Sequence, residues 1–274
     1  MTSESQSDPF GRFRTGSTAY RALSKDEIKT DMDARYETGD AYPNPALWIH
    51  VHHKELEATI AELLSGKTKG RRILELGCGT GGVAPHNVRD ADLIVGTDLS
   101  EAALRVAEGF FRDSHSIQFR QMDAENLQFT DSSFDIVVAK EVLEHLPNPS
   151  SCIDEVCRVL KAGGYFVLSS PNRDSLHLRV NRKLGKADFA CAGDHIQEFT
   201  YSEMKEMLTG RGFLIEAAEG VTLMPYHYVE GVFPDAVKAA EDADEEFVDW
   251  LRILGRRAGP EFAFCYVILA RKRD

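Results

Sequence analysis

The sequence lacks any long hydrophobic segment. No apolar run approaches the roughly 18 residues that a membrane-spanning helix needs. The first residues, MTSESQSD, also lack the basic and then apolar order of a secretion signal. We therefore expect a cytoplasmic protein without stable membrane insertion.

Cysteine and positive charge are both in short supply. The five cysteines are odd in number and show no close-paired spacing, at positions Cys78, Cys152, Cys157, Cys191 and Cys265. This pattern favours reduced thiols over a disulfide framework or a paired-cysteine metal site. Lys and Arg total 32 against 44 Asp and Glu, which gives a net charge of −12. Because binding to a phosphate backbone relies on clustered Lys and Arg, this balance argues against a nucleic-acid partner.

What the chain does contain is an alternation of β-rich and helical segments. Its 274 residues, 43% of them hydrophobic, suit one domain with an extension. From residue 71 onwards the β-rich runs are RRILELG, LIVGTDLS, SIQFRQMD, FDIVVAK and GYFVLSSP, with helical spacing between them. Such alternation predicts a doubly wound α/β domain. We expect residues 1–65 to form a mobile end and an N-terminal helical cap, and residues 66–274 to form the main domain.

The C-terminal part departs from this alternation. A β-rich run over residues 262–273 has no helix after it and could pair antiparallel in the sheet. Before it, helical spacing continues to Leu254 inside an insertion of about residues 224–260. The acidic outer side of that helix is typical of a solvated face on a packed helix. The alternative is a lid over the substrate, with Phe247 or Trp250 lining the pocket.

Closure over a ligand is a further expectation, because the core runs leave the acceptor side of the sheet uncovered. We expect residues 1–45 and 234–254 to close over bound ligands. The early aromatic residues nearest the site would then be Tyr36 and Trp48.

A glycine-rich turn follows the first predicted strand, in ILELGCGTGG at residues 73–82. It can be described as G-x-G-x-x-G, as in dinucleotide-binding proteins, or as G-x-G-x-G preceded by Glu75. The absence of Lys-Ser/Thr after the glycines excludes a triphosphate-binding P-loop. Asp98 and Asp123 end the next two strands and fit an adenosine without a pyrophosphate, with Asp98 accepting both ribose hydroxyls. Glu75 would face a cationic group.

Five segments together resemble a known family. ELGCGTGG, GTDLS, MDAENL, FDIVVAKEVLEHLPNP and RVLKAGGYFVLSSPN are similar to the successive motifs of class I S-adenosylmethionine-dependent methyltransferases. They are closest to the ubiquinone- and menaquinone-biosynthesis-type small-molecule group (methyltransferase type 11), over residues 71–223. The resemblance implies a seven-stranded sheet of order 3-2-1-4-5-7-6 with the last strand antiparallel.

The resemblance also implies the cofactor, S-adenosylmethionine, and the residues around it. Glu75, Gly77 and Gly79 would surround its amino-acid end, and Lys140 would lie near its carboxylate. Asp98 would bind its ribose. Leu99 would pack on the adenine, and Asp123 with Ala124 would hold the adenine edge. The family commonly has another residue type at Lys140.

The acceptor is expected to be a small organic molecule, methylated at a hydroxyl. An oxygen nucleophile usually needs a base, and the candidates are His145, His195 and His227. His195 comes directly before the predicted penultimate helix, where related enzymes often place substrate-facing residues. Transfer to nitrogen or carbon stays open, as do a nicotinamide-dependent oxidoreductase and a non-enzymatic cofactor sensor. The early histidines His50, His52 and His53 are expected at the surface or at a helix cap, because they are too close together to share one helical face.

The run KEVLEHLPNP also raises the question of a divalent metal. If a helix began at once, Glu141, Glu144 and His145 would share a face at positions i, i+3 and i+4. Two carboxylates and an imidazole suit Mg²⁺, Mn²⁺ or Fe²⁺. Pro147 and Pro149 limit such a helix, and many metal-free relatives carry a Glu-His pair here. We therefore do not assign a metal, and His145 and His195 remain the catalytic candidates.

Overall fold

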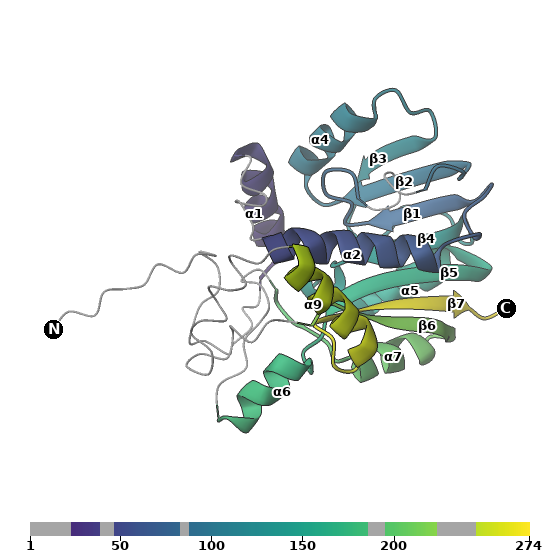
Figure 1. Cartoon of the computed structure of the whole chain (residues 1–274). Helices are drawn as coiled ribbons and strands as arrows, with labels where there is room; N and C mark the ends of the chain where they lie inside the picture. Colours follow the sequence, from purple (N-terminus) through teal and green to yellow (C-terminus); the bar gives the residue numbers. More distant parts are fainter. Residues whose placement is uncertain (1–22, 39–46, 83–87, 186–194, 224–244) are drawn as a thin grey trace.

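A seven-stranded sheet forms the centre of the protein (Figure 1). In this computed structural model the described residues are 23–38, 47–82, 88–185, 195–223 and 245–274. The strands are β1 (Arg72–Leu76), β2 (Leu93–Asp98), β3 (Ile117–Gln121), β4 (Phe134–Lys140), β5 (Leu160–Pro171), β6 (Phe213–Val221) and β7 (Cys265–Lys272). Their order is β3-β2-β1-β4-β5-β7-β6, and β7 runs antiparallel to both of its neighbours. The predicted strand order and the antiparallel last strand are confirmed.

Helices cover both faces of the sheet. α2 (Leu47–Leu63) and α9 (Glu245–Ala258) lie on the near face in Figure 1, whereas α5 (Pro149–Val159) and α7 (Tyr201–Thr209) lie behind. α4 (Glu101–Phe111) packs on β2 and β3, and α1 (Lys25–Thr38) lies against α4. α6 (Leu176–Lys183) projects from the sheet, and η1 (Leu143–His145) is a single 3₁₀ turn. None of the helices in the described part of the chain combines the length and the hydropathy needed to cross a bilayer.

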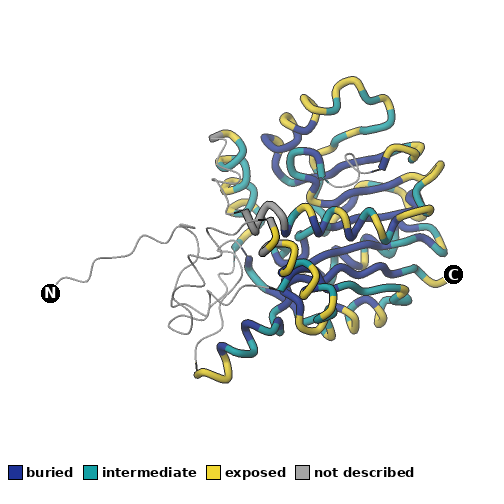
Figure 2. The backbone as a smooth tube through the Cα atoms, in the orientation of Figure 1, coloured by how far each residue is buried: buried dark blue, intermediate teal, exposed yellow. Residues whose placement is uncertain are grey.

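The sheet is buried on both faces, as its dark central strands show in Figure 2. Successive side chains of a strand point to opposite faces. In β4, Val137 belongs to the apolar cluster that includes α5 and α7, whereas Ile136 and Val138 belong to the cluster that includes α2. This two-sided burial explains why the parallel strands are nearly unbroken apolar runs in the sequence.

The predicted helix near the C-terminus is present as α9, with Leu251 buried and Trp250 exposed over 54% of its surface. Its second half packs closely on the end of β6, because a Cβ on Gly255 would lie 2.3 Å from backbone atoms of Thr222. Arg256 further joins α9 to α2 through Glu55. This part of α9 therefore fits the packed-helix interpretation. Residues 224–244 and the side chains of Phe247 and Trp48 lie outside the described part, so the lid stays a prediction, as do the domain boundaries.

β1 lies between β2 and β4, so the chain connections leave the sheet in opposite directions on either side of it. In open α/β sheets a ligand crevice forms at such a point, beyond the carboxyl ends of the strands. The loops after β1, β2 and β4 all lie at that edge, and so does the beginning of β7, because that strand runs the opposite way.

Candidate functional site

The loop after β1 has a backbone that requires glycine. Gly77, Gly79 and Gly82 have φ angles of +60°, +53° and +67°, a region that L side chains rarely adopt. A Cβ on Gly82 would lie 2.4 Å from the carboxyl carbon of Glu75, and one on Gly79 would lie 3.0 Å from the hydroxyl of Tyr36. The loop thus fits closely between a buried carboxylate and helix α1, which brings the hydroxyl of Tyr36 beside the loop.

Asp98 fixes the loop to the end of β2. Its Oδ2 accepts a hydrogen bond from the Gly79 N–H at 2.8 Å, and its Oδ1 accepts one from the Ser100 N–H at 2.8 Å. Its exposed fraction is 2%, and burial raises the pKa of Asp98 in spite of these donors. Each carboxylate oxygen has two acceptor positions, so the bonds from Gly79 and Ser100 do not exhaust the acceptor capacity of Asp98.

Asp123 and α1 meet at the end of β3. The Lys25 ammonium lies 2.5 Å from Asp123 Oδ2 and 2.8 Å from Glu125 Oε2. Asp123 Oδ1 accepts a hydrogen bond from the Glu125 N–H, and both Ala124 and Leu99 are half-buried beside this region. α1 therefore lies against the edge at which the sequence predicts adenine, and Lys25 supplies a positive charge there that the motifs did not reveal.

Lys140, at the end of β4, forms an ion pair with Glu57 of α2, with Nζ 2.8 Å from Oε1. The predicted position beside a cofactor carboxylate is not tested by this contact, but the structure gives Lys140 a definite partner within the protein. Glu75, in β1, is 1% exposed, so two buried acid groups contact the glycine loop, Glu75 at Gly82 and Asp98 at Gly79.

The two catalytic candidates lie side by side. The rings of His145 and His195 meet edge to face, with centroids 4.9 Å apart. They come together because the N–H groups of Ile196 and Gln197 donate to the backbone carbonyl of Glu144, which fastens the segment before α7 onto η1. His195 Nδ1 lies 2.7 Å from Oε1 of Glu198, whose side chain is fully buried. The structure thus contains a histidine–carboxylate pair.

Glu144 completes this catalytic cluster. It is 0% exposed, and its Oε2 accepts a 3.3 Å hydrogen bond from Ser170. Among the described residues its Oε1 has no hydrogen-bond partner. Burial, together with the neighbouring Glu141, raises the pKa of Glu144 well above its usual value. A protonated Glu144 could therefore donate a hydrogen bond to a substrate oxygen.

The shared helical face considered for Glu141, Glu144 and His145 does not form. Glu141 adopts a φ of +55°, and the chain then makes one 3₁₀ turn instead of an α-helix. Potential ligand atoms of Glu144 and His145 instead converge with His195, all within 4.8 Å of one another. Glu141 turns to a different group, formed with His52 and Cys265.

His52 corrects a second expectation. It was predicted at the surface or at a helix cap, but it is 3% exposed, and its ring contacts Thr222, directly after β6, and Cys265 of β7. The expectation used only the spacing of the three histidines. That spacing does not show that the sheet covers the side of α2 on which His52 lies. His227 and the side chain of His50 lie outside the described residues.

Sequence reasoning also missed Glu198. It lies three residues after His195 in HIQEFT, before the helix α7 begins. The helical i, i+3 rule gave no reason to pair them in a non-helical segment. An acid three residues from a candidate base was the available signal.

Comparison with known proteins agrees with this geometry. Residues 74–168 match the family described as a methyltransferase domain. A ubiquinone biosynthesis O-methyltransferase from Alkalilimnicola ehrlichii is 38% identical over 117 residues, which cover 42% of this chain and 47% of that protein. The protein of the same name from Aeromonas salmonicida is 29% identical over 167 residues, covering 59% of this chain and 70% of that protein.

Similarity extends to solved structures. An S-adenosylmethionine-dependent methyltransferase from Mesorhizobium loti superposes with a TM-score of 0.54 at 18% identity, covering 79% of this chain and 98% of that one. At this identity the likeness shows the fold alone. The chain spans about half the length of the first curated relatives that it matches.

Proposed function

Because the chain belongs to the class I S-adenosylmethionine-dependent methyltransferases, we propose that it transfers a methyl group to a hydroxyl oxygen of a small organic molecule. The observation that carries this proposal is the His195–Glu198 pair beside Glu144 and His145. Val142, directly before η1, packs on Gly77, so this cluster begins against the glycine loop. The O-methyltransferase names of the relatives agree with an oxygen acceptor.

The cofactor-binding residues of the proposal are those of the glycine-loop edge. Asp98 has acceptor positions for the two ribose hydroxyls, and the buried Glu75 would face the ammonium group of the methionine end. Gly77 and Gly79 would surround that end, and both pack closely on protein side chains, because a Cβ on Gly77 would meet Val142 and one on Gly79 would meet Tyr36. Leu99, Asp123 and Ala124 would hold the adenine, with Lys25 offsetting the charge of Asp123.

When bound, S-adenosylmethionine supplies a methyl group on a positively charged sulfur. The protein must align the acceptor in line with that methyl and exclude water. His195 is the proposed base. In the tautomer in which Nδ1–H donates to Glu198, Nε2 carries the lone pair that can remove the hydroxyl proton. Glu198 then stabilises the imidazolium that forms, and Glu144 and His145 would orient the acceptor oxygen.

Transfer to nitrogen or carbon is the alternative for the same site, because a free amine needs only deprotonation before attack. No feature of the cluster favours a nicotinamide-dependent oxidoreductase over these. The paired histidine and buried carboxylate favour oxygen, since they supply a base that an oxygen nucleophile needs.

The test is an acceptor screen in which S-adenosylhomocysteine formation is measured with phenols, catechols, aliphatic alcohols and amines. Mass spectrometry of each product then locates the methyl group. We expect turnover with a hydroxyl acceptor and loss of that turnover in His195→Gln, with cofactor affinity unchanged. Lys205→Gln, on the exposed side of α7, serves as the control. Products methylated only at nitrogen would overturn the oxygen assignment, and binding of S-adenosylhomocysteine without turnover of any acceptor would favour a sensor.

A further inference from the structure

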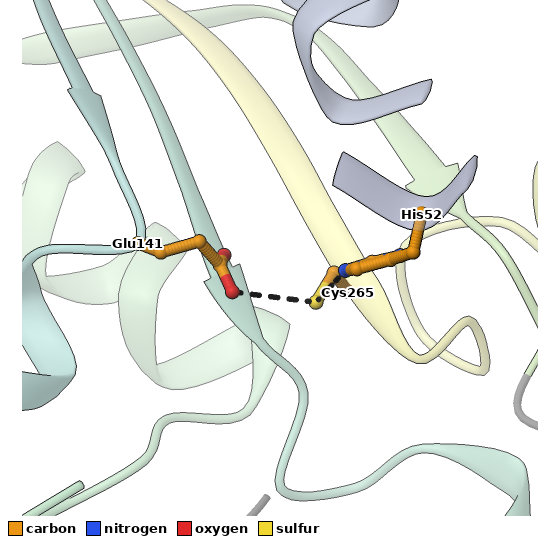
Figure 3. A group of neighbouring side chains, drawn as sticks. All are labelled: His52, Glu141 and Cys265. Atoms are coloured by element: carbon orange, nitrogen blue, oxygen red, sulfur yellow. Dashed lines mark hydrogen bonds between the residues drawn. The ribbon is translucent and has the colours of Figure 1, made fainter. Parts of the chain in front are cut away.

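Three side chains with metal-binding atoms meet outside the catalytic cluster (Figure 3). His52 comes from α2, Cys265 from the first residue of β7, and Glu141 from the residue after β4. Cys265 Sγ lies 3.4 Å from His52 Nε2 and 3.9 Å from Glu141 Oε2. All three ligand atoms lie within 4.8 Å of one another.

The protonation of His52 follows from its neighbours. Thr222 donates its hydroxyl proton to the Val221 carbonyl at 2.9 Å, so its Oγ1 can accept a hydrogen bond. His52 Nδ1 lies 2.7 Å from that oxygen and donates a hydrogen bond to it in the tautomer that carries its proton on Nδ1. His52 Nε2 then carries its lone pair toward Cys265.

Glu141 is held in a comparable way. The Ser169 hydroxyl donates to Glu141 Oε1 at 3.0 Å, which leaves Oε2 directed at Cys265. The backbone of Glu141 is also unusual, with a φ of +55°, and that of Thr222 has a φ of +52°. Non-glycine residues in this region cost energy and are concentrated at functional sites. Two such residues therefore belong to one cluster, Glu141 as a member and Thr222 as the hydrogen-bond partner of His52.

We propose that His52, Cys265 and Glu141 form a binding site for a zinc-type divalent cation. Zinc bonds of about 2.3 Å to sulfur and about 2.0–2.1 Å to nitrogen or oxygen give sulfur–nitrogen and sulfur–oxygen edges of about 3.5–3.6 Å in a tetrahedron. The observed separations of 3.4 Å and 3.9 Å lie on either side of that value. Three protein ligands leave a fourth position for water or another ligand, as in catalytic zinc sites.

Charge and supporting contacts agree with this ion. One thiolate, one carboxylate and one neutral imidazole balance a charge of +2, so the buried complex would be neutral. Binding would release the thiol proton of Cys265 to solvent as the Zn–S bond forms. Thr222 and Ser169 supply the hydrogen bonds that commonly orient metal ligands. A thiolate ligand selects zinc or cobalt over magnesium.

The experiment uses the full chain, freed of metal by chelation and titrated with Co²⁺ in the absence of cofactor and acceptor, so its outcome does not depend on the proposed methyl transfer. We expect one Co²⁺ per chain, a near-ultraviolet thiolate-to-cobalt absorption band, and displacement by an equivalent of Zn²⁺ but not by excess Mg²⁺. Cys265→Ser should abolish the band. Glu141→Gln, at a half-buried position, should weaken Co²⁺ binding by about tenfold or more.

Thr222→Val keeps all three ligands but removes the support of His52. We expect it to retain the band while binding Co²⁺ about 10–100-fold more weakly. Cys157→Ser, on α5, is the matched control and should change neither the band nor the affinity. Far-ultraviolet circular dichroism establishes that each variant is folded. Cobalt bound without a thiolate band, a band that persists in Cys265→Ser, or one lost in Cys157→Ser would overturn the proposal.

Discussion

Asp98 shows how one side chain can organise both the protein and a ligand. Its two oxygens already accept backbone N–H groups from the glycine loop and from the start of α4. The carboxylate therefore stays in place before any cofactor arrives, and a ribose would bind to a rigid acceptor.

Asp98→Ala should weaken binding of S-adenosylhomocysteine by about 3–6 kcal/mol, because two ribose hydroxyls lose a charged acceptor and each such bond is worth about 1.5–3 kcal/mol. Calorimetry measures this change. Glu101→Ala, an exposed acid on α4 nearby, should leave the affinity unaltered. An Asp98→Ala variant that is folded and binds as tightly as the unaltered protein would refute the ribose assignment.

His195→Gly tests the base. We expect kcat to fall by about 100-fold or more, since general-base catalysis typically contributes 10²–10⁴-fold, while the KM for S-adenosylmethionine is unchanged. Added imidazole should restore part of the rate in His195→Gly. Glu198→Gln should lower kcat without being rescued by imidazole, because the ring is present but loses its carboxylate partner. No rescue of His195→Gly would indicate that His195 contacts substrate without accepting a proton.

Among the structural elements, the glycine loop can be compared with the turn after α2, because each contains a glycine with a positive φ angle. Gly82 and Gly66 have nearly equal φ angles of +67° and +73°. An added Cβ would meet the Glu75 carboxylate at Gly82, but nothing within 4 Å at Gly66. The two positions therefore separate backbone strain from close packing.

Each Gly→Ala substitution should lower the free energy of unfolding by about 1–2 kcal/mol through strain. Only Gly82→Ala should also weaken S-adenosylhomocysteine binding, by about tenfold or more, because it displaces Glu75. Thermal denaturation and calorimetry report the two quantities. Equal affinities in Gly82→Ala and Gly66→Ala would show that Glu75 does not contact the cofactor.

Helix α1 is polar and depends on charged contacts for its position. Lys25 reaches Asp123, and Asp33 accepts a hydrogen bond from Ser100 at the start of α4. Such contacts contribute little at a solvated surface, so we expect α1 to open locally and to be stabilised by the cofactor.

Hydrogen exchange over residues 25–38 should slow when S-adenosylhomocysteine binds. Asp33→Asn should speed exchange in the ligand-free protein, because α4 loses a negative charge at its N-terminus. Asp31→Asn, two residues earlier and paired with Arg35 of the same helix, is the control. Exchange that is equal with and without ligand would argue against α1 as a cap.

For the molecule as a whole, Asp135 links three central strands at the edge opposite the site. It accepts hydrogen bonds from the Arg72 N–H at 3.0 Å and from Lys161 at 3.0 Å. Burial raises the pKa of Asp135, but these donors outweigh it and the pKa is lowered. A group whose pKa is lowered by folding stabilises the folded state above its unfolded pKa, about 3.9 for Asp. That contribution is lost as the pH falls through the lower, folded-state pKa.

Asp135→Asn should therefore lower the free energy of unfolding by about 1–2 kcal/mol at neutral pH. The difference from the unaltered protein should begin to shrink below about pH 4, where Asp135 becomes protonated in the unfolded chain, and should vanish as the pH falls through the lower folded-state pKa. Urea denaturation across this range measures it. Asp131→Asn, whose side chain is 77% exposed, should show almost no difference, and a constant gap for Asp135→Asn down to the lowest pH would refute the linkage.

The positions of Glu75, Asp98 and Asp123 at one edge followed from the sequence, because parallel strands in a doubly wound sheet all end at the same edge. The apolar runs predicted the strands, and the motif resemblance gave their order. These features depend on local periodicity and on short connections, which a sequence displays directly.

The His195–Glu198 pair and the His52–Cys265–Glu141 cluster could not be obtained in this way. Cys265 joins His52 across 213 positions of the chain, and their contact exists because α2 packs on the sheet at the antiparallel strand β7. Glu141 turns toward them because its φ of +55° ends β4 without starting a helix. A sequence pattern fixes which residues share a strand or helix face, but the packing of separate elements and the strained residues between them fix which side chains finally meet.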